Sequence, residues 1–144
     1  MKKYELTQET KEVNGHTLHR IRALRDFADV KAGDLGGFVE NESNLDMFGE
    51  SWVFDEACVF GEARVFDQAR VFGEARVFGK ARVSGESWVF WEAWVFDQAC
   101  VFDQARVFDQ ARVFGKSRVF GESWVSGESR VFGESCVSGE ARVC

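Results

Sequence analysis

The sequence predicts an all-β fold, a parallel β-helix with three short sides in each turn. From Ser51 to Cys144 one six-residue phrase repeats without a gap. It consists of Ala or Ser, a variable residue, Val, usually Phe, usually Gly or Asp, and usually an acid or amide. Such regular repetition is typical of a solenoid. The small residue and Val alternate, as in a strand with one buried face, and the Gly or Asp suits a corner. Three phrases then close one turn, and turns stack about 4.8 Å apart by parallel strand pairing.

The phrase also predicts which side chains are buried. Valines such as Val53, Val59 and Val65 point inward, with small residues such as Ala57 and Ala63 between them. In the opposite register the helix would bury unpaired arginines, at a large cost in free energy. We therefore expect a narrow core of Val and Ala, with the variable residue of each phrase on the outside.

Residues 1–42 have a different composition and predict an N-terminal cap that covers the first turn and blocks edge pairing. Two strand-like stretches, Tyr4–Leu6 and Leu18–Leu24, flank Asn14-Gly15, a strong hairpin signal. Gly33, Gly36 and Gly37 predict tight turns.

The β-helix is expected over residues 43–144. Leu45–Glu50 is a degenerate first phrase, with Leu45 in the small position and Met47 in the Val position. From Ser51 onward the phrases predict about five turns, roughly 25 Å of helix. Because the repeat stops in the middle of a phrase at Cys144, we expect either that a partner covers the last turn or that the chain is truncated.

The repeat resembles that of left-handed parallel β-helix proteins, in which an aliphatic residue is followed four positions later by a small one. Val65 with Ala69, and Val71 with Ala75, match this rule. The resemblance implies a left-handed helix. The chain departs from the family in one respect, since Phe usually follows Val where a small or polar residue is common.

A second resemblance covers roughly residues 20–60. Residues 26–39, DFADVKAGDLGGFV, followed by Trp52, Phe54 and Asp55, are similar to the N-terminus of a YdcK-like family of bacterial and prophage proteins labelled acetyltransferase-like. The resemblance implies fold and lineage. It implies little about chemistry, because the family's acetyltransferase label itself rests on the fold.

Residues eighteen apart should lie above one another, so the surface can be written as columns. The first column below alternates Trp and Arg and predicts cation–π stacking. The second is basic, the third is acidic, and the last two are aromatic ladders that either shield the corners or mediate self-association. The columns are Trp52, Arg70, Trp88, Arg106, Trp124, Arg142; then Arg64, Arg82, Cys100, Arg118, Cys136; then Glu56, Glu74, Glu92, Gln110, Glu128; then Phe54, Phe72, Phe90, Phe108; and finally Phe60, Phe78, Phe96, Phe114, Phe132.

The densest aromatic cluster is the candidate interaction patch. Trp91 replaces the usual Gly or Asp of the corner, and residues that break a local rule are candidates for function. Drift of the repeat is the alternative explanation. The patch comprises Trp88, Phe90, Trp91, Trp94 and Phe96.

Composition and motifs favour no catalytic, cofactor or metal site. The net charge of −6 argues against a general nucleic-acid binder, and there is neither a signal peptide nor an apolar run that could span a membrane. Enzymes that resemble this fold use histidines on the helix, whereas His16 and His19 lie in the cap. Cys100 and Cys136 share a column but lie two turns apart, beyond disulfide reach, so we expect free thiols and a cytoplasmic protein.

The sequence therefore predicts a non-enzymatic structural or protein-interaction solenoid that self-associates. A dimer would form through the Phe columns or through the C-terminal turn, whose edge comprises Val137, Ala141, Val143 and Cys144. Two alternatives stay open. One is an acyltransferase-like enzyme with a site between subunits. The other is a phage-derived protein that binds a host partner through the aromatic patch.

Overall fold

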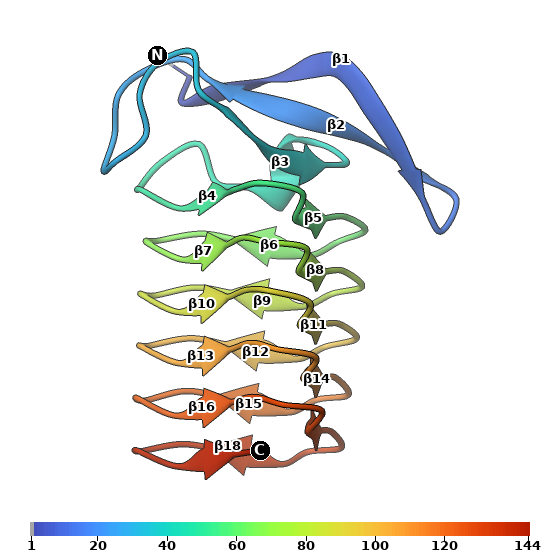
Figure 1. Ribbon diagram of the computed structural model, residues 1–144, viewed down its shortest axis with the longest axis vertical. Coiled ribbons are helices and arrows are strands. Elements are labelled where there is room, and N and C mark those ends of the chain that lie inside the picture. The colour runs from blue at the N-terminus through green and yellow to red at the C-terminus, as the bar shows by residue number, and fades with distance from the viewer. Residues whose placement is uncertain (1) are drawn as a thin grey trace.

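A computed structural model describes residues 2–144. The chain forms a parallel β-helix of about six turns, with an antiparallel hairpin over its N-terminal end (Figure 1). The longer elements are β1 (Tyr4–Val13), β2 (His16–Ala23), β3 (Leu35–Val39) and the short 3₁₀ helix η1 (Glu42–Asn44). Sixteen two-residue strands follow: β4 (Trp52–Val53), β5 (Cys58–Val59), β6 (Arg64–Val65), β7 (Arg70–Val71), β8 (Arg76–Val77), β9 (Arg82–Val83), β10 (Trp88–Val89), β11 (Trp94–Val95), β12 (Cys100–Val101), β13 (Arg106–Val107), β14 (Arg112–Val113), β15 (Arg118–Val119), β16 (Trp124–Val125), β17 (Arg130–Val131), β18 (Cys136–Val137) and β19 (Arg142–Val143).

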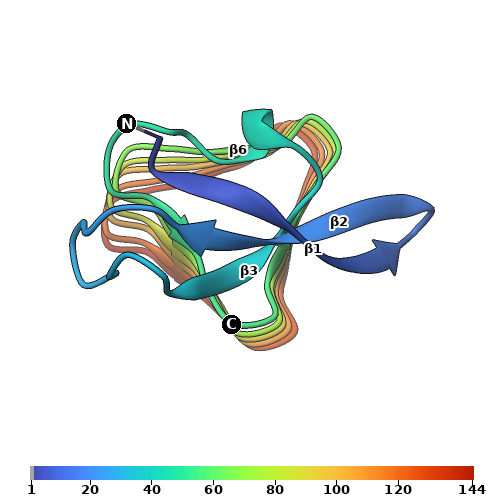
Figure 2. The same cartoon turned by 90° about the horizontal axis from the view of Figure 1, so that it is seen from above.

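These strands form three sheets, one on each side of a triangle (Figure 2). The first face contains β3, β5, β8, β11, β14 and β17, and the hairpin strands β1 and β2 extend it at the top. The second face contains β6, β9, β12, β15 and β18. The third face contains β4, β7, β10, β13, β16 and β19. The chain visits the faces in this order, so the corner between the third and first faces lies opposite the second face.

The predicted register and core are confirmed. Parallel strands pair residues eighteen apart, as Val89 does with Val71 above and Val107 below. The valines and alanines from Val53 to Val125 that fill the two inward positions are fully buried. Where serine takes the small position from Ser87 onward, its hydroxyl donates to a backbone carbonyl three residues earlier, as Ser87 Oγ does to Ser84 O at 2.7 Å. The core therefore accepts serine without leaving an unpaired polar atom.

The corners are built from residues with positive φ, a conformation that glycine and aspartate tolerate better than most residues. Every corner aspartate lies above a glycine, whose backbone N–H it caps. Asp109 Oδ2, for example, accepts from Gly127 N at 3.0 Å. The other pairs are Asp55 with Gly73, Asp67 with Gly85, Asp97 with Gly115 and Asp103 with Gly121. This order gives each aspartate a hydrogen-bond donor and keeps carboxylates from stacking directly on one another.

The predicted hairpin is also confirmed. Asn14 and Gly15 turn between β1 and β2 with φ values of 51° and 83°. Strand β2 pairs antiparallel with β3, and β3 pairs parallel with β5 through Val39 and Val59. The hairpin thus continues the first sheet and lies across the open end of the first turn.

The expected number of turns, about five, is wrong because a turn forms before Ser51. Strand β3, within the predicted cap of residues 1–42, is the top rung of the first face. Leu45 pairs with Val65 and is fully buried. Leu45 therefore occupies the valine position and not the small position that the sequence suggested. This pairing spans twenty residues, two more than the regular turn, and the extra residues lie in the corner before Gly49.

Lys3 closes the top of the helix with a buried ammonium group. Its Nζ donates to Ser51 O at 2.9 Å and to Ser51 Oγ at 3.3 Å, and the side chain is fully buried. Desolvation lowers the pKa of Lys3 to about 8, although Asp46 partly opposes this.

The lowered pKa predicts a specific dependence of stability on pH. Between about pH 8 and the unfolded-state pKa of about 10.4, the unfolded chain binds more protons at Lys3 than the folded chain, so raising the pH stabilises the fold. Thermal unfolding of the wild type and of Lys3→Met should be measured at pH 7 and pH 9.5. The stability of the wild type relative to that of the variant should be higher at pH 9.5 than at pH 7. A constant difference between the two proteins would contradict a lowered pKa.

Candidate functional site

The candidate patch wraps around the corner between the third and first faces. Trp88 lies on the third face and contacts Phe90, with ring centroids 6.3 Å apart. Trp91 lies at the corner itself and contacts Phe90 edge-on at 5.1 Å. Trp94 and Phe96 form a second group with each other, 6.3 Å apart, on the first face and the corner that follows it. The structure thus places the five residues in two neighbouring groups.

Most of the phenylalanines stack face to face along the helix axis. Phe72 and Phe90 are 4.8 Å apart and within 2° of parallel, and Phe78 and Phe96 are 4.9 Å apart. Except for buried Phe60 and exposed Phe132, the rings of these two ladders are half-buried. Stacked rings cover one another, so the ladders present narrow aromatic edges along two corners.

Three tryptophans have close cation–π contacts; those of Trp88 and Trp124 were predicted from the Trp–Arg column, and that of Trp94 was not. The guanidinium of Arg106 lies over Trp88, that of Arg112 over Trp94 and that of Arg142 over Trp124, each 4.3 Å from the ring centroid. Burial lowers the pKa of Arg106 and of Arg112. In these three contacts the arginine comes from the next turn; Trp94 also has Arg76 of the preceding turn over its ring, 5.6 Å from the centroid.

The top of the predicted Trp–Arg column differs. Trp52 is only 1% exposed, because Tyr4 and Phe27 of the cap pack against it. Arg70, which follows it in the column, forms an ion pair with Asp29 instead. The cap therefore replaces the arginine as the cover of this indole.

Trp91 is covered neither by an arginine nor by the cap. Its indole is 54% exposed, and its aromatic contacts are the edges of Phe90 and Phe108. Among residues 2–144, no cation lies over its ring. It adopts φ 60°, where every other corner of the repeat uses Gly or Asp. A large side chain in this conformation costs about 1–2 kcal/mol, which the two aromatic contacts of Trp91, worth about 0.5–1.5 kcal/mol each, roughly offset.

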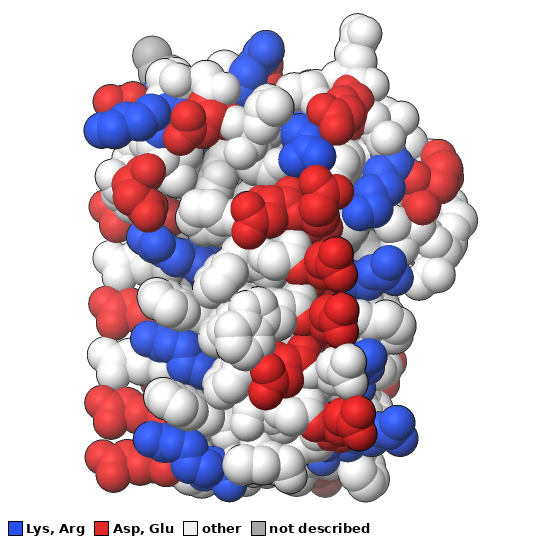
Figure 3. All heavy atoms as spheres, in the orientation of Figure 1, with Lys and Arg blue, Asp and Glu red and all other residues white. Residues whose placement is uncertain are grey.

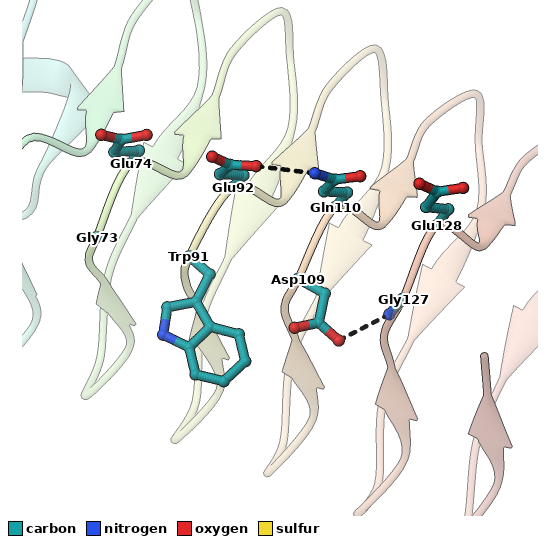
Figure 4. Close-up of a pocket in the computed structure, with 8 residues that line it drawn as sticks. All are labelled: Gly73, Glu74, Trp91, Glu92, Asp109, Gln110, Gly127 and Glu128. Atoms are coloured by element: carbon teal, nitrogen blue, oxygen red, sulfur yellow. Dashed lines mark hydrogen bonds between the residues drawn. The ribbon is translucent and has the colours of Figure 1, made fainter.

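A shallow groove of about 520 Å³ runs along the axis beside Trp91 (Figure 4). We call this groove and its rim the acidic corner. The indole of Trp91 lies on one side, and a row of acid and amide side chains lies on the other. It is lined by Gly73, Glu74, Trp91, Glu92, Asp109, Gln110, Gly127 and Glu128. The same surface is visible from the side as an acidic column next to exposed white side chains (Figure 3).

None of the four carboxylates of this groove forms an ion pair within residues 2–144, although Arg76 and Arg112 border Glu74 and Glu92 in an adjoining hollow. Glu92 accepts a hydrogen bond from Gln110 at 3.1 Å, which spaces the charges. Glu56, the uppermost member of the same column, is paired with Arg20 of the cap. The column thus carries its unpaired charge below the cap, beside Trp91.

Three exposed arginines were not singled out from the sequence as site residues. Arg64, Arg82 and Arg118 project from the second face. Within residues 2–144 they form no ion pair, no side-chain hydrogen bond and no stacking contact. The basic column in the sequence held the signal, but only the structure shows that these side chains lack partners.

The predicted oligomer edge lies on the last turn. Val137 and Val143 are partly buried, while Ala141 and Cys144 are exposed. Strands β17, β18 and β19 each pair on one side only in the described chain. All four cysteines are free thiols, and burial raises the pKa of Cys58.

The histidines lie in the hairpin. His16 Nδ1 is 3.0 Å from a carboxylate oxygen of Glu40, and this hydrogen bond lowers the pKa of Glu40. His19 Nδ1 is 3.0 Å from Thr7 O. Residues 2–144 contain no group of three or more His, Cys, Asp or Glu arranged to hold a metal ion, and no helix long and apolar enough to cross a membrane.

No protein-family model matches this chain, and no curated protein matches it in sequence.

Proposed function

We propose that this chain is a non-catalytic β-solenoid that acts by self-association, and that the acidic corner is part of the contact surface. The observation that carries the proposal is the open indole of Trp91. This residue is exposed, strained in its backbone and flanked by unpaired carboxylates. A contact that covers the indole and neutralises the carboxylates would offset both the backbone strain at Trp91 and the repulsion between the carboxylates.

The rest of the molecule supports this role. The turns share one repeating core, which makes the helix a rigid support with regularly spaced side chains. Half-buried aromatic rings line the same corner as Trp91, and aromatic residues are enriched in protein interfaces. The corner therefore combines an aromatic centre with a charged rim.

Light scattering over a concentration series, with reductant present, tests the proposal. We expect the wild type to form dimers or larger assemblies. Trp91→Gly should need a concentration at least about tenfold higher to assemble to the same extent. The free energy of unfolding of Trp91→Gly should lie within about 1 kcal/mol of that of the wild type, because relief of the positive φ offsets the lost aromatic contacts.

Leu35→Ala is the control, since Leu35 is 58% exposed but lies in β3 of the cap, outside the acidic corner. The molar mass of this variant should equal that of the wild type at each concentration. A wild type that stays monomeric at every concentration would refute self-association and favour a different protein as the partner of the patch. Binding of acetyl-coenzyme A at micromolar concentration would favour the acyltransferase-like alternative.

A further inference from the structure

We infer that the acidic corner of one copy docks onto the second face of another copy, with the two helix axes parallel. This inference rests on the proposed self-association and specifies its surfaces. It follows from three features of the described chain: the positions of the two surfaces, the charges that lack partners on each, and the order of those charges along the axis.

The two surfaces lie on opposite sides of the triangle. Seen along the axis, β6 of the second face lies on the upper side, and the end of the chain marks the lower corner, between the third and first faces (Figure 2). The hairpin tip projects past another side of the triangle. A copy displaced sideways, without rotation, therefore brings its corner against the second face of its neighbour.

The second face offers free cations. Arg64, Arg82 and Arg118 are exposed and have no partner within residues 2–144, whereas arginines on the third face are already engaged. Arg106, for instance, covers Trp88 and donates to the carbonyl oxygen of Gln104 at 2.8 Å. The arginines of the second face are thus available to an outside partner.

The acidic corner offers the complementary anions in the same order. Down the axis, the second face presents Arg64, Arg82, Cys100 and Arg118. The acidic column presents Glu74, Glu92, Gln110 and Glu128. Both read charged, charged, neutral, charged.

Because both columns belong to the same helix, their spacing along the axis is identical, about 4.8 Å per turn. Two parallel copies at nearly the same height can therefore form all three ion pairs together, leaving Cys100 beside Gln110. A single matched pair would be weak at an exposed surface, but a matched ladder fixes both the register and the polarity of the contact.

Trp91 belongs to this arrangement. It precedes Glu92, so the arginine that pairs with Glu92 would be Arg82 of the neighbouring copy, placed beside the open indole. The chain already uses this contact three times, with a guanidinium 4.3 Å from an indole centroid. Covering Trp91 with an arginine would give it the same environment as Trp88, Trp94 and Trp124.

The contact joins two different surfaces, so it does not close on itself. A docked pair keeps one free acidic corner and one free second face, and repeated docking by sideways displacement gives an open row of parallel helices. We therefore expect assemblies that grow with concentration and weaken as salt screens the charges.

Paired charge reversal tests the inference. Glu74→Arg with Glu92→Arg makes both surfaces basic, and Arg64→Glu with Arg82→Glu makes both acidic. Each double variant alone should associate at least about tenfold more weakly than the wild type. An equimolar mixture should assemble again, since every corner then finds a face of opposite charge. Sedimentation velocity and electron microscopy at low salt would measure the size and shape of the assemblies.

Arg130→Glu and Glu12→Arg are the controls. Arg130 is an exposed arginine on the first face, and Glu12 is an exposed acid in the hairpin, so both changes should leave assembly unaltered. If the wild type assembles but the double variants assemble equally well, the docking inference is wrong while self-association stands. If the double variants lose assembly and the mixture does not regain it, the pairing of these two surfaces is refuted. A monomeric wild type would refute both proposals.

Discussion

Replacing Trp52 by alanine is expected to lower the free energy of unfolding by about 3–5 kcal/mol, the largest effect of any change considered for this chain. Trp52 is almost fully buried between the first turn and the cap, with ring centroids 6.1 Å from Tyr4 and 5.3 Å from Phe27. Its removal leaves a cavity where the hairpin meets the helix. Urea unfolding followed by circular dichroism would measure the loss.

Trp124→Ala is the matched control because Trp124 occupies the same column four turns below. It is 43% exposed and is covered by Arg142. Its loss should cost about 1 kcal/mol, the value of an exposed cation–π contact with some buried apolar area. Equal losses for the two variants would show that the cap does not stabilise the first turn through Trp52.

Gly37→Ala is expected to cost about 3 kcal/mol or more, although it adds a single methyl group. A Cβ at this position would lie 2.5 Å from the carbonyl oxygen of Ala57 and 2.6 Å from a side-chain carbon of Val53. The oxygen belongs to the backbone of the next turn and accepts the hydrogen bond of Phe38 N, so it cannot move without breaking a rung. Thermal unfolding by circular dichroism should show a large fall in midpoint.

Leu35→Ala, in the same strand, provides the comparison. Leu35 is 58% exposed, so its truncation should change the unfolding free energy by less than about 1 kcal/mol. If Gly37→Ala unfolded at the same midpoint as Leu35→Ala, strand β3 would not lie as close to the second turn as the structure places it.

The helix could be predicted from the sequence because each phrase repeats the same pattern of strand, core and turn residues. Ala63 and Val65 alternate as a half-buried strand, and Asp67 supplies the corner, so strand, core and turn all follow from six residues. Stacking eighteen residues apart then follows from three phrases per turn. The Arg–Trp contacts followed in turn from that stacking.

The first turn could not be predicted in the same way because it lacks the repeat. Leu45 reads as a poor match in the small position, yet a two-residue insertion before Gly49 moves it into the valine position. Trp52 reads as an outward residue, and its burial depends on Phe27 and Tyr4, which lie far away in the sequence. Contacts made by a cap come from its tertiary placement and carry no periodic signal.

The candidate site was predicted only in part. Trp91 was singled out because it breaks the corner rule, and the structure shows that it is open to solvent. The inclusion of Trp94 in the patch stays a prediction; its indole is covered by Arg112, whereas that of Trp91 is open. Arg64 and Arg82 were written as a column but not recognised as free, because a sequence does not show which side chains already have partners.

The regular stacking of the turns has a consequence for how such a chain can change in length. Loss or duplication of one phrase in the gene would still place valine over valine, so the interior would accept it. Every surface column would, however, be broken at the change, because the part below it moves to another face, so the glutamate row would no longer run continuously along one corner. Only a change of three phrases would preserve both the core and the surface columns, because the core positions recur every six residues and the columns every eighteen.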